Sequence, residues 1–585
     1  MNTRSSRSKA GDTRSTRRRF LAGAAVGAFA WVPAFRIPPA SAQATCAPPP
    51  AFPPSIPLYQ QAYRNWSGEI AVDDLWTCAP TSPLDVETVV NWAYENGWRI
   101  RPRGLAHNWS PLSVTPGSTC NAPVVLIDTT QHLTAISISP SPSPARVTVQ
   151  TGASMEALLT CLEESGYGFT ATPAPGDVTV GGALAIDAHG TAIPAQGESR
   201  PPGHTYGSLS NLILSLTAVV WDPGSMRYAQ RTFDRSDPEI RPLLAHVGRA
   251  FITEVTLQVG DNQRLRCRSF VNVPAAELFA APGSGASRTF ASYVESAGRV
   301  EAIWFPYTSC PWLKVWSVSP VKPLLSRKVQ SPYNYVFADN IPLLISDLAD
   351  QIVTGAGVLT PLFGQAQYDL AAVGLLATAA SDLWGWSKNL LLYVKPTTLR
   401  VTANGYAILT RRSDIQRVIH EFTTQYAQLR AVYQAQGLYP MNGPVEIRVT
   451  GLDQPAEVEV PSAGPPMLSP ARPRPDHPEW DVVVWLDLLT LPGTPLANAF
   501  FREIEQWIFA NYAGSYAAVR PEWSKGWGYT STAAWSDPTV ISTTIPDAYR
   551  AGQAAGDTWD AALAALNAFD PHRIFSNAFL DALLP

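Results

Sequence analysis

Two glycine-rich segments constrain the fold of this chain more than any other feature. The first, residues 103–110, follows a short predicted strand, and the second, residues 176–190, contains four glycines. Small residues in tight turns let consecutive backbone N–H groups converge on an anion such as a pyrophosphate. Glycine turns are also common as purely structural elements. Two in succession favour a mixed α/β domain that binds a phosphate-containing ligand.

Local signals support that class over the first half of the chain. Ser82 as N-cap, Pro83 at the first position and Gly97 after the last turn predict a helix over residues 83–96. A second helix is predicted over residues 154–164, and strands over 98–101, 124–128, 147–151, 212–221 and 252–259. From about residue 265 Trp, Tyr and Pro become dense, which indicates a second domain with a large apolar interior.

The amino-terminal segment has the pattern of an export signal. Residues 1–42 hold seven Arg and Lys9 against Asp12 alone, and Arg17, Arg18 and Arg19 precede a short apolar run. That run is too short to cross a bilayer, and the small residues 40–42 follow it. We therefore expect a twin-arginine signal cleaved after Ala42, a route used by folded and often cofactor-bearing proteins. The alternatives are a disordered basic tail and a short anchor.

Composition excludes several classes of protein. Only 15% of residues are charged and 46% are hydrophobic, which rules out disorder, collagen and coiled coil. Beyond residue 42 there are 35 basic and 46 acidic residues, so nucleic acid is not an expected partner. No later run reaches 18 consecutive apolar residues.

Common catalytic and metal motifs are missing. The sequence has no Cys-x-x-Cys, no Gly-x-Ser-x-Gly and no Walker loop, so zinc, serine hydrolase and nucleotidase chemistry are not predicted and no metal is expected. Gly166-Tyr167-Gly168 begins a match to the dinucleotide fingerprint, but it follows a helix, so we interpret the match as chance. Six dispersed cysteines allow a disulfide or two.

The two glycine segments and their surroundings resemble a known flavoprotein superfamily. Residues 101–109 resemble the first FAD loop of the vanillyl-alcohol-oxidase superfamily, and residues 175–190 resemble its second loop, which holds the pyrophosphate. Residues 247–256 resemble its closing strand, and residues 570–577 resemble the return segment that packs on the flavin.

Other segments narrow the resemblance. Residues 445–448 and 520–525 resemble elements shared by aldonolactone and polyol oxidases with the covalent-flavin bacterial cholesterol oxidases, and residues 301–306, 331–335 and 442–444 resemble the cholesterol oxidases specifically. The sugar-lactone enzymes usually carry His where Glu522 stands. The resemblance thus implies FAD, dioxygen and a 3β-hydroxysterol, with hydrogen peroxide and a 4-en-3-one as products.

Three charged residues are the candidate catalytic groups. Glu446 and Arg448 are two residues apart, so on a strand they point to one face, where Arg448 would orient the carboxylate and stabilise an alkoxide. Glu301 precedes an apolar aromatic run, and burial there would raise its pKa. Either carboxylate could be the base, and Glu301 is the first candidate for the proton shuttle of isomerisation. The alternatives are a surface ion pair and a surface strand cap.

The resemblance also implies cofactor-binding residues. His107 would bond covalently to the flavin; without its loop, a neutral His donating to a backbone carbonyl would be favoured. His189 has no comparable loop and is interpreted as mainly structural. The remaining predicted FAD contacts are Pro102, Arg103, Gly104, Leu105, Ala106, Asn108, Trp109, Ser110, Pro175, Gly176, Val180, Gly181, Gly182, Asp187, His189, Gly190, Ile252 and Asn577.

Together these observations predict an exported two-domain α+β flavoprotein. We expect a lead-in at 43–54, an FAD domain at 55–262 completed by 546–585, and a substrate domain at 263–545. The chain is expected to be monomeric and to contact lipid surfaces transiently. A polyol or aldonolactone oxidase of the same fold, and an exported sterol-binding protein without flavin, are the alternatives.

Overall fold

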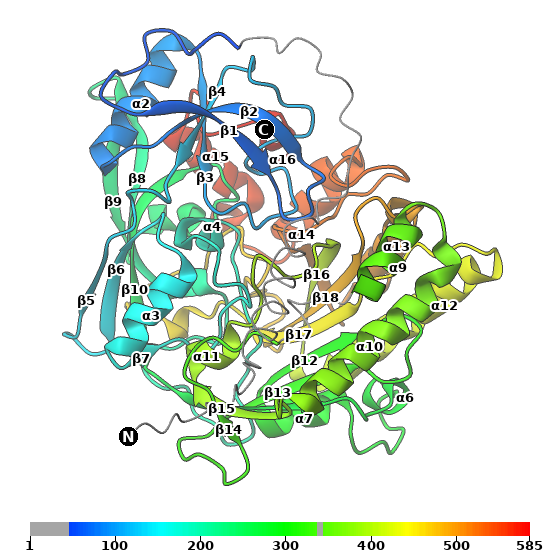
Figure 1. The fold of residues 1–585 in the computed structure, drawn as a ribbon. Helices are drawn as coiled ribbons and strands as arrows, with labels where there is room; N and C mark the ends of the chain where they lie inside the picture. The colour runs from blue at the N-terminus through cyan, green and yellow to red at the C-terminus, as the bar shows by residue number, and fades with distance from the viewer. Residues whose placement is uncertain (1–45, 336–342) are drawn as a thin grey trace, which may run out of the picture. The chain divides into compact units, whose positions relative to one another are not determined.

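The computed structural model describes residues 46–335 and 343–585. The predicted signal at 1–42 and residues 43–45 lie outside the described residues. Pro48–Pro585 form one unit that contains three β-sheets and is drawn as a ribbon in Figure 1. Its mixture of helices and sheets confirms the predicted α+β class.

Two sheets occupy the amino-terminal part of this unit. The four-stranded sheet has the order β1 (Leu58–Arg64), β2 (Ala71–Cys78), β4 (Val124–Asp128), β3 (Arg99–Arg103). The six-stranded sheet has the order β5 (Ile136–Ser139), β6 (Ala145–Gln150), β10 (Phe251–Asp261), β8 (Ile213–Asp222), β9 (Arg227–Asp234), and β7 (Tyr167–Gly168) pairs with β10. The predicted strands are therefore present, with ends that differ from the prediction by no more than two residues.

The two predicted helices of this part begin and end within one residue of where the capping signals place them. Helix α2 (Pro83–Asn96) has a full capping box between Ser82 and Asp85 and ends at Gly97, whose φ of 70° suits a residue without Cβ. Its face with Val86, Val89 and Val90 is buried against the first sheet. The other helices here are α3 (Met155–Glu164), α4 (Val180–Ala185) and α5 (Arg241–Leu244).

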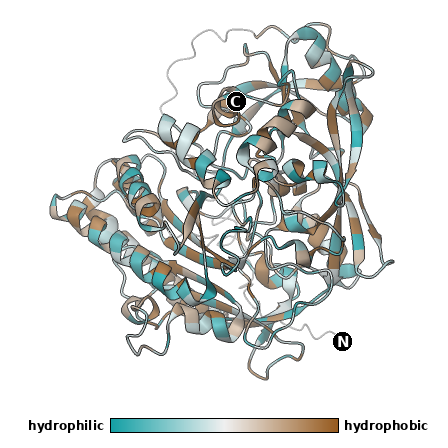
Figure 2. Ribbon diagram, turned by 180° about the vertical axis from the view of Figure 1, so that it is seen from behind, coloured by the Kyte–Doolittle hydropathy of each residue, from teal (hydrophilic) through white to brown (hydrophobic). Residues whose placement is uncertain are grey.

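The third sheet has nine strands and lies in the carboxyl-terminal half. Its order is β14 (Arg327–Lys328), β15 (Asp382–Trp386), β11 (Arg264–Phe270), β13 (Trp312–Val318), β12 (Arg299–Trp304), β17 (Val445–Gly451), β18 (Val482–Thr490), β16 (Thr402–Thr410), β19 (Ala518–Pro521). All nine residues of β18 are buried, and Figure 2 shows how hydrophobic residues concentrate in the strands. The boundary that we expected at residues 262–263 falls between β10 and β11.

Helices cover this sheet. Helices α7 (Phe290–Ala297), α10 (Thr360–Ala377) and α12 (Ile415–Ala435) contact its strands, and α13 (Ala497–Asn511) packs on α12. The remaining helices are α6 (Ala275–Leu278), α9 (Leu343–Val353), α11 (Ser387–Leu391), α14 (Ile545–Arg550), α15 (Trp559–Phe569) and α16 (Ala578–Leu583). No helix among the described residues is both long and apolar enough to cross a membrane.

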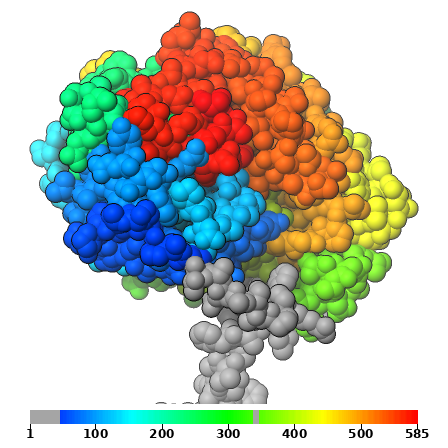
Figure 3. Space-filling model, turned by 90° about the horizontal axis from the view of Figure 1, so that it is seen from above, coloured from blue at the N-terminus to red at the C-terminus, as the bar shows by residue number. Residues whose placement is uncertain are grey.

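The carboxyl-terminal segment returns to the first sheet. Ile100 N donates to Ile574 O at 2.8 Å, and Arg99 pairs with Asp581 at 2.7 Å. In Figure 3 the red carboxyl-terminal surface accordingly lies beside the blue amino-terminal surface.

Cys46 and Cys120 are disulfide-bonded, whereas the other four cysteines are free.

The structure corrects two details of the glycine segments. Pro102 and Arg103 belong to β3 rather than to the loop. The second segment is not simply a tight turn, because it contains α4. The first turn of α4 is capped by the Thr179 hydroxyl, which accepts a hydrogen bond from Gly182 N. Tyr167 and Gly168 form β7, and the Gly166–Gly168 segment does not line the cavity described below. This agrees with its interpretation as a chance match.

Candidate active site

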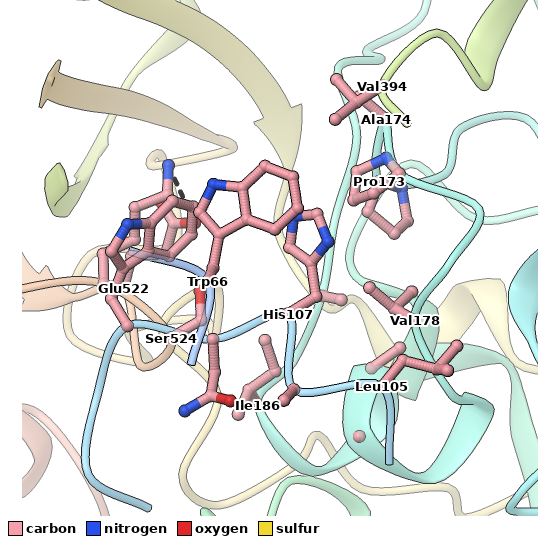
Figure 4. Close-up of a pocket in the computed structure, with 18 of the residues that line it drawn as sticks. Trp66, Leu105, His107, Pro173, Ala174, Val178, Ile186, Val394, Glu522 and Ser524 are labelled. Atoms are coloured by element: carbon pink, nitrogen blue, oxygen red, sulfur yellow. Dashed lines mark ion pairs between the residues drawn. The ribbon is translucent and has the colours of Figure 1, made fainter. Parts of the chain in front are cut away.

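A cavity of about 460 Å³ lies where both glycine segments meet the nine-stranded sheet. Its walls come from segments far apart in the chain, including β3, α4, β10, β17 and the segment after β19. Figure 4 shows that three segments bring His107, Trp66 and Glu522 together at this cavity: the loop after β3, the turn between β1 and β2, and the segment after β19.

Two glycines allow close packing beside the cavity, and at Gly104 the first glycine segment contacts the second. A Cβ on Gly104 would lie 2.5 Å from Thr179 Oγ1, and one on Gly190 would lie 2.7 Å from Thr172 O. Trp109 N and Ser110 N both donate to Ser524 O at 3.0 Å, so the first loop is also fixed against the segment after β19. These contacts hold the loops open around the cavity.

His107 lies on the cavity wall with a ring nitrogen available. Its ring stacks on Trp66 with centroids 3.9 Å apart, and Nδ1 lies 3.7 Å from Asp177 Oδ2. Nδ1 is buried and has no hydrogen-bond partner among the described residues. The alternative of a hydrogen bond from this ring nitrogen to a backbone carbonyl is therefore not what the structure shows.

Most of the predicted cofactor residues lie on the cavity wall. These are Pro102, Arg103, Gly104, Leu105, Ala106, His107, Asn108, Trp109, Pro175, Gly181, Gly182, Asp187, His189, Gly190 and Ile252. Buried polar atoms without hydrogen-bond partners in the described part of the chain include Arg103 Nη1, Thr172 Oγ1 and Glu522 Oε2, all from residues of this wall. Unsatisfied buried groups are costly, so these atoms fit a polar ligand such as FAD.

Four predicted cofactor residues do not line the cavity, for reasons of packing. The Val180 side chain is fully buried in the hydrophobic core, and Ser110 is also fully buried. Gly176 packs against Glu156 and Leu392. The Asn577 side chain caps α16 and donates to the carbonyls of Pro111 and Leu112, so it ties the first loop to the carboxyl end.

The candidate catalytic residues form a row across the nine-stranded sheet. The strand register places Lys314 of β13 opposite Glu301 of β12, Glu301 opposite Arg448 of β17, and Arg448 opposite Trp485 of β18. Arg448 Nε donates to Glu301 Oε1 at 2.8 Å. Its Nη2 donates to Glu446 Oε2, which confirms that residues 446 and 448 share a face.

A second set of charges adjoins this row. Arg448 Nη1 donates to Asp487 Oδ2 at 2.9 Å, Lys525 also pairs with Asp487, and Lys525 Nζ lies 3.4 Å from Glu522 Oε1. Burial raises the pKa of Asp487 to about 7, and the nearby Glu522 adds to this rise. Gly405 makes room for both carboxylates, because a Cβ there would lie 2.7 Å from Asp487 Oδ1 and 2.9 Å from Glu522 Oε2.

His189 joins this set rather than serving packing alone. Its ring stacks on Trp485 at 3.5 Å between centroids, and Nε2 lies 3.8 Å from Glu522 Oε1. Lys525 and His189 together hold the pKa of Glu522 well below its usual range, despite burial.

Glu301 is buried but its predicted pKa shift is wrong in direction. Its carboxylate accepts hydrogen bonds from Arg448 and, at 2.5 Å, from the Tyr393 hydroxyl, while Lys314 Nζ lies 3.6 Å away. Burial alone would raise its pKa, but the charges of Lys314 and Arg448 outweigh burial and lower it. Only 1% of the surface of Glu301 is exposed. Glu446, Arg448 and Tyr393 line the cavity, whereas Glu301 does not.

Sequence reasoning missed three residues of this site, Lys314, Asp487 and Lys525. Lys314 is fully buried among aromatic rings, with Nζ 2.8 Å from the Tyr393 ring centroid, and burial lowers its pKa to about 8. Asp487 and Lys525 complete the charge network. The available signal was a lone charge inside an apolar strand, as at Lys314 in β13 and Asp487 in β18.

The cavity is apolar away from these charges. Aromatic and aliphatic side chains from the residue that follows β12 and from β13, α9, α10 and α11 line this part: Phe305, Trp312, Trp316, Ile345, Leu370 and Leu391. Such a lining desolvates a hydrocarbon and leaves orientation to the few charged groups. Most other tryptophans, including Trp480, Trp523 and Trp559, pack in the core.

Comparison with known proteins matches both parts of the site. The family model "FAD binding domain" matches residues 76–227, and "Cholesterol oxidase, substrate-binding" matches residues 264–585. A solved structure described as a solvent-stable cholesterol oxidase is 63% identical, with a TM-score of 0.91, covering 92% of this chain and 100% of its own. A cholesterol oxidase from Brevibacterium sterolicum is 48% identical, with a TM-score of 0.91, covering 93% and 100%. No curated protein matches the chain.

The paired loops, the unsatisfied polar atoms and these matches define an FAD-dependent oxidoreductase with separate cofactor and substrate regions. More narrowly, the chain belongs to the cholesterol oxidase family.

Proposed function

We propose that this chain is an exported oxidase that converts a 3β-hydroxysterol into the 3-ketone, with movement of the 5,6 double bond to the 4,5 position. The observation that carries the proposal is a cavity with an apolar aromatic region on one side and the Glu446–Arg448 pair on its wall. A polyol or sugar lactone would need polar groups where Phe305, Trp312 and Trp316 lie.

Glu446 is the proposed proton acceptor. It lies on the cavity wall beside Arg448, and its Oε1 receives no hydrogen bond from a described residue. Glu446 takes the hydroxyl proton of the sterol, while Arg448 stabilises the developing alkoxide. FAD, when bound, supplies the hydride acceptor and passes the electrons to dioxygen, which gives hydrogen peroxide.

Glu301 is proposed as a positioning residue. Because it lies behind Arg448 and Tyr393, it fixes the guanidinium rather than meeting the substrate. Glu446 is therefore also the first candidate for moving a proton during isomerisation, in reverse of the order that the sequence suggested.

His107 is proposed to attach FAD covalently through its imidazole to the 8α carbon of the flavin. The open Nδ1 and the stacked Trp66 support this role. The arginine-rich segment at residues 17–19 supports export of the loaded protein, with cleavage after Ala42.

Acid precipitation of the purified mature protein tests the linkage. Yellow colour should stay with the pellet of the unmodified protein and move to the supernatant for His107→Ala, with His189→Ala as a matched control that retains colour. Colour in the supernatant of the unmodified protein would remove the covalent link. A colourless protein would favour a sterol-binding protein without flavin, and oxidation of polyols but not sterols would favour the other oxidase.

A further inference from the structure

His107 of the first glycine segment and Asp177 of the second lie close together with their polar atoms unsatisfied. His107 Nδ1 lies 3.7 Å from Asp177 Oδ2. His107 Nδ1 and Asp177 Oδ1 are both buried, and neither has a hydrogen-bond partner among the residues that the structure describes. Buried polar atoms in this state cost free energy. The pair is therefore better explained by a chemical role than by a contribution to stability.

The backbone on both sides of Asp177 is held in place by main-chain hydrogen bonds. Glu156 N donates to Gly176 O at 3.0 Å, and Met155 N donates to Val178 O at 2.8 Å. These two bonds tie the segment around Asp177 to the start of α3. The carboxylate is therefore positioned by the protein itself rather than by a ligand.

His107 is positioned independently of Asp177. Its ring stacks on Trp66 with centroids 3.9 Å apart, and Trp66 N donates to Asn108 O at 3.0 Å. The stacked ring and the loop that carries His107 are thus fixed to each other. Two reacting groups that are held in place before the reaction need less reorganisation to react.

The surroundings of His107 leave Asp177 as its charged proton acceptor. Leu105, Pro173 and Val178, which are labelled near His107 in Figure 4, are apolar. Within residues 46–335 and 343–585, Asp177 is the one carboxylate within 4.0 Å of a ring nitrogen of His107. His107 lines the cavity and Asp177 does not, so the carboxylate lies behind the imidazole as seen from the cavity. A base placed next to a nucleophile in this way activates it.

Attachment of FAD to His107 requires the removal of two hydrogens. The new C–N bond replaces one C–H bond of the flavin 8α methyl group and the N–H bond of the imidazole. The two protons and two electrons released convert one dioxygen to hydrogen peroxide, so the step balances with the oxidant that the proposed function already uses. The imidazole becomes the better nucleophile when a carboxylate takes up its proton.

We propose that Asp177 is the base for covalent attachment of FAD, and that its carboxylate accepts the proton that His107 gives up as the C–N bond forms. This inference rests on the proposed linkage at His107. The chain then carries both the nucleophile and the base of the attachment reaction, and Asp177 is needed for attachment but not for binding of the flavin.

The test separates the amount of flavin bound from the rate at which it is attached. The full chain is produced in flavin-starved cells and supplied with FAD in air. Absorbance of the folded protein measures bound flavin, and fluorescence of the denatured protein band measures attached flavin over time. Asp177→Asn keeps the shape of the side chain but cannot accept the proton. It should bind as much FAD as the unmodified protein and attach it at least about tenfold more slowly.

The matched control is Glu156→Gln, because Glu156 is an exposed carboxylate whose backbone contacts the same segment. This variant should attach flavin at the unmodified rate.

Asp177→Ala distinguishes a chemical role from a structural one. The Asp177 side chain is 25% exposed, so a small carboxylate can enter the space that the alanine leaves. Added formate should restore part of the attachment rate in Asp177→Ala, whereas chloride at the same concentration should not. A residue that only held the loop in shape would not be replaced by formate.

Two results would overturn the role of Asp177 while the linkage at His107 stands. One is attachment by Asp177→Asn at the unmodified rate, and the other is slow attachment in Asp177→Ala that formate does not restore. Flavin that binds to the unmodified protein but is never attached would overturn both the linkage and this proposal, and sterol oxidation would then be measured with the bound flavin. An unmodified protein that binds no FAD would overturn the oxidase function as well.

Discussion

Glu446 and Glu301 differ in access rather than in residue type, and this difference leads to a prediction at the residue scale. Glu446→Gln should lower kcat for sterol oxidation by about 10²-fold or more, since it removes the proton acceptor at the cavity wall. Glu301→Gln should lower kcat less, because Glu301 acts through Arg448. Steady-state rates and the ratio of 5-en-3-one to 4-en-3-one product measure both effects.

The opposite pattern would contradict this assignment. If Glu301→Gln stopped formation of the 4-en-3-one while Glu446→Gln still formed it, Glu301 would be the proton shuttle despite its burial. If Glu301→Gln kept full turnover and full isomerisation, even its positioning role would be lost.

Residue spacing predicted only the part of this site that neighbouring residues form, which is the pair of Glu446 and Arg448. Glu446 and Arg448 share a face because strand side chains alternate, which two positions in the sequence are enough to show. Lys314 and Asp487 join the site through the pairing of strands distant in sequence, and Lys525 lies in the segment after β19. Lys314 and Arg448 reverse the expected pKa shift of Glu301, so the direction of that shift required the register of β12, β13 and β17.

At the scale of elements, the contact between the two glycine segments leads to a second prediction. Gly104→Ala places a Cβ against Thr179, so the loops must separate and flavin content should fall. Thr179→Ala removes the obstructing atoms but also the cap of α4, which costs about 1 kcal/mol. The double variant should therefore retain more flavin than Gly104→Ala alone, as measured by absorbance of the purified proteins.

Equal flavin loss in the single Gly104→Ala variant and in the double variant would show that the contact with Thr179 is not the cause of the lower flavin content.

Capping signals predicted α2 and α3 almost to the residue, because caps are local. Helix α4 was not predicted, since its six residues carry too little periodicity to be recognised inside a glycine-rich segment.

At the scale of the whole molecule, two buried carboxyl groups join the FAD-binding and substrate-binding regions. Asp187 lines the cavity beside the second loop, and Asp453 follows β17. The Ser469 hydroxyl lies 2.5 Å from an oxygen of each, and Ser208 Oγ lies 2.7 Å from Asp187 and 3.1 Å from Asp453. Burial, together with the nearby Asp453, raises the pKa of Asp187 well above 3.8.

This raised pKa has a direct consequence for stability. A carboxyl group whose pKa is higher in the folded state stabilises the fold at low pH, and that contribution is lost as pH rises from about 4 through the native pKa. Asp187→Asn supplies a permanent donor without a charge. Its Tm should therefore fall less than that of the unmodified protein as pH is raised across this range, as thermal unfolding at several pH values measures. Parallel pH profiles for the two proteins would mean that Asp187 is already ionised.

Composition predicted the division into an FAD-binding region and a substrate-binding region, but it did not predict the contacts that join them. The density of Trp, Tyr and Pro from about residue 265 marks the substrate region, whose nine-stranded sheet begins at β11. The contacts of Asp187 with Ser469 and of Asn577 with the first loop span hundreds of residues, and no local pattern reports them.

Anaerobic reduction tests the central claim most directly. The visible spectrum of the purified protein is recorded before and after addition of a 3β-hydroxysterol without dioxygen. The account predicts that the flavin bands bleach with the sterol, stay unchanged with a polyol or sugar lactone, and return when dioxygen is admitted. Bleaching by the polyol but not by the sterol, or a protein without flavin bands, would contradict it.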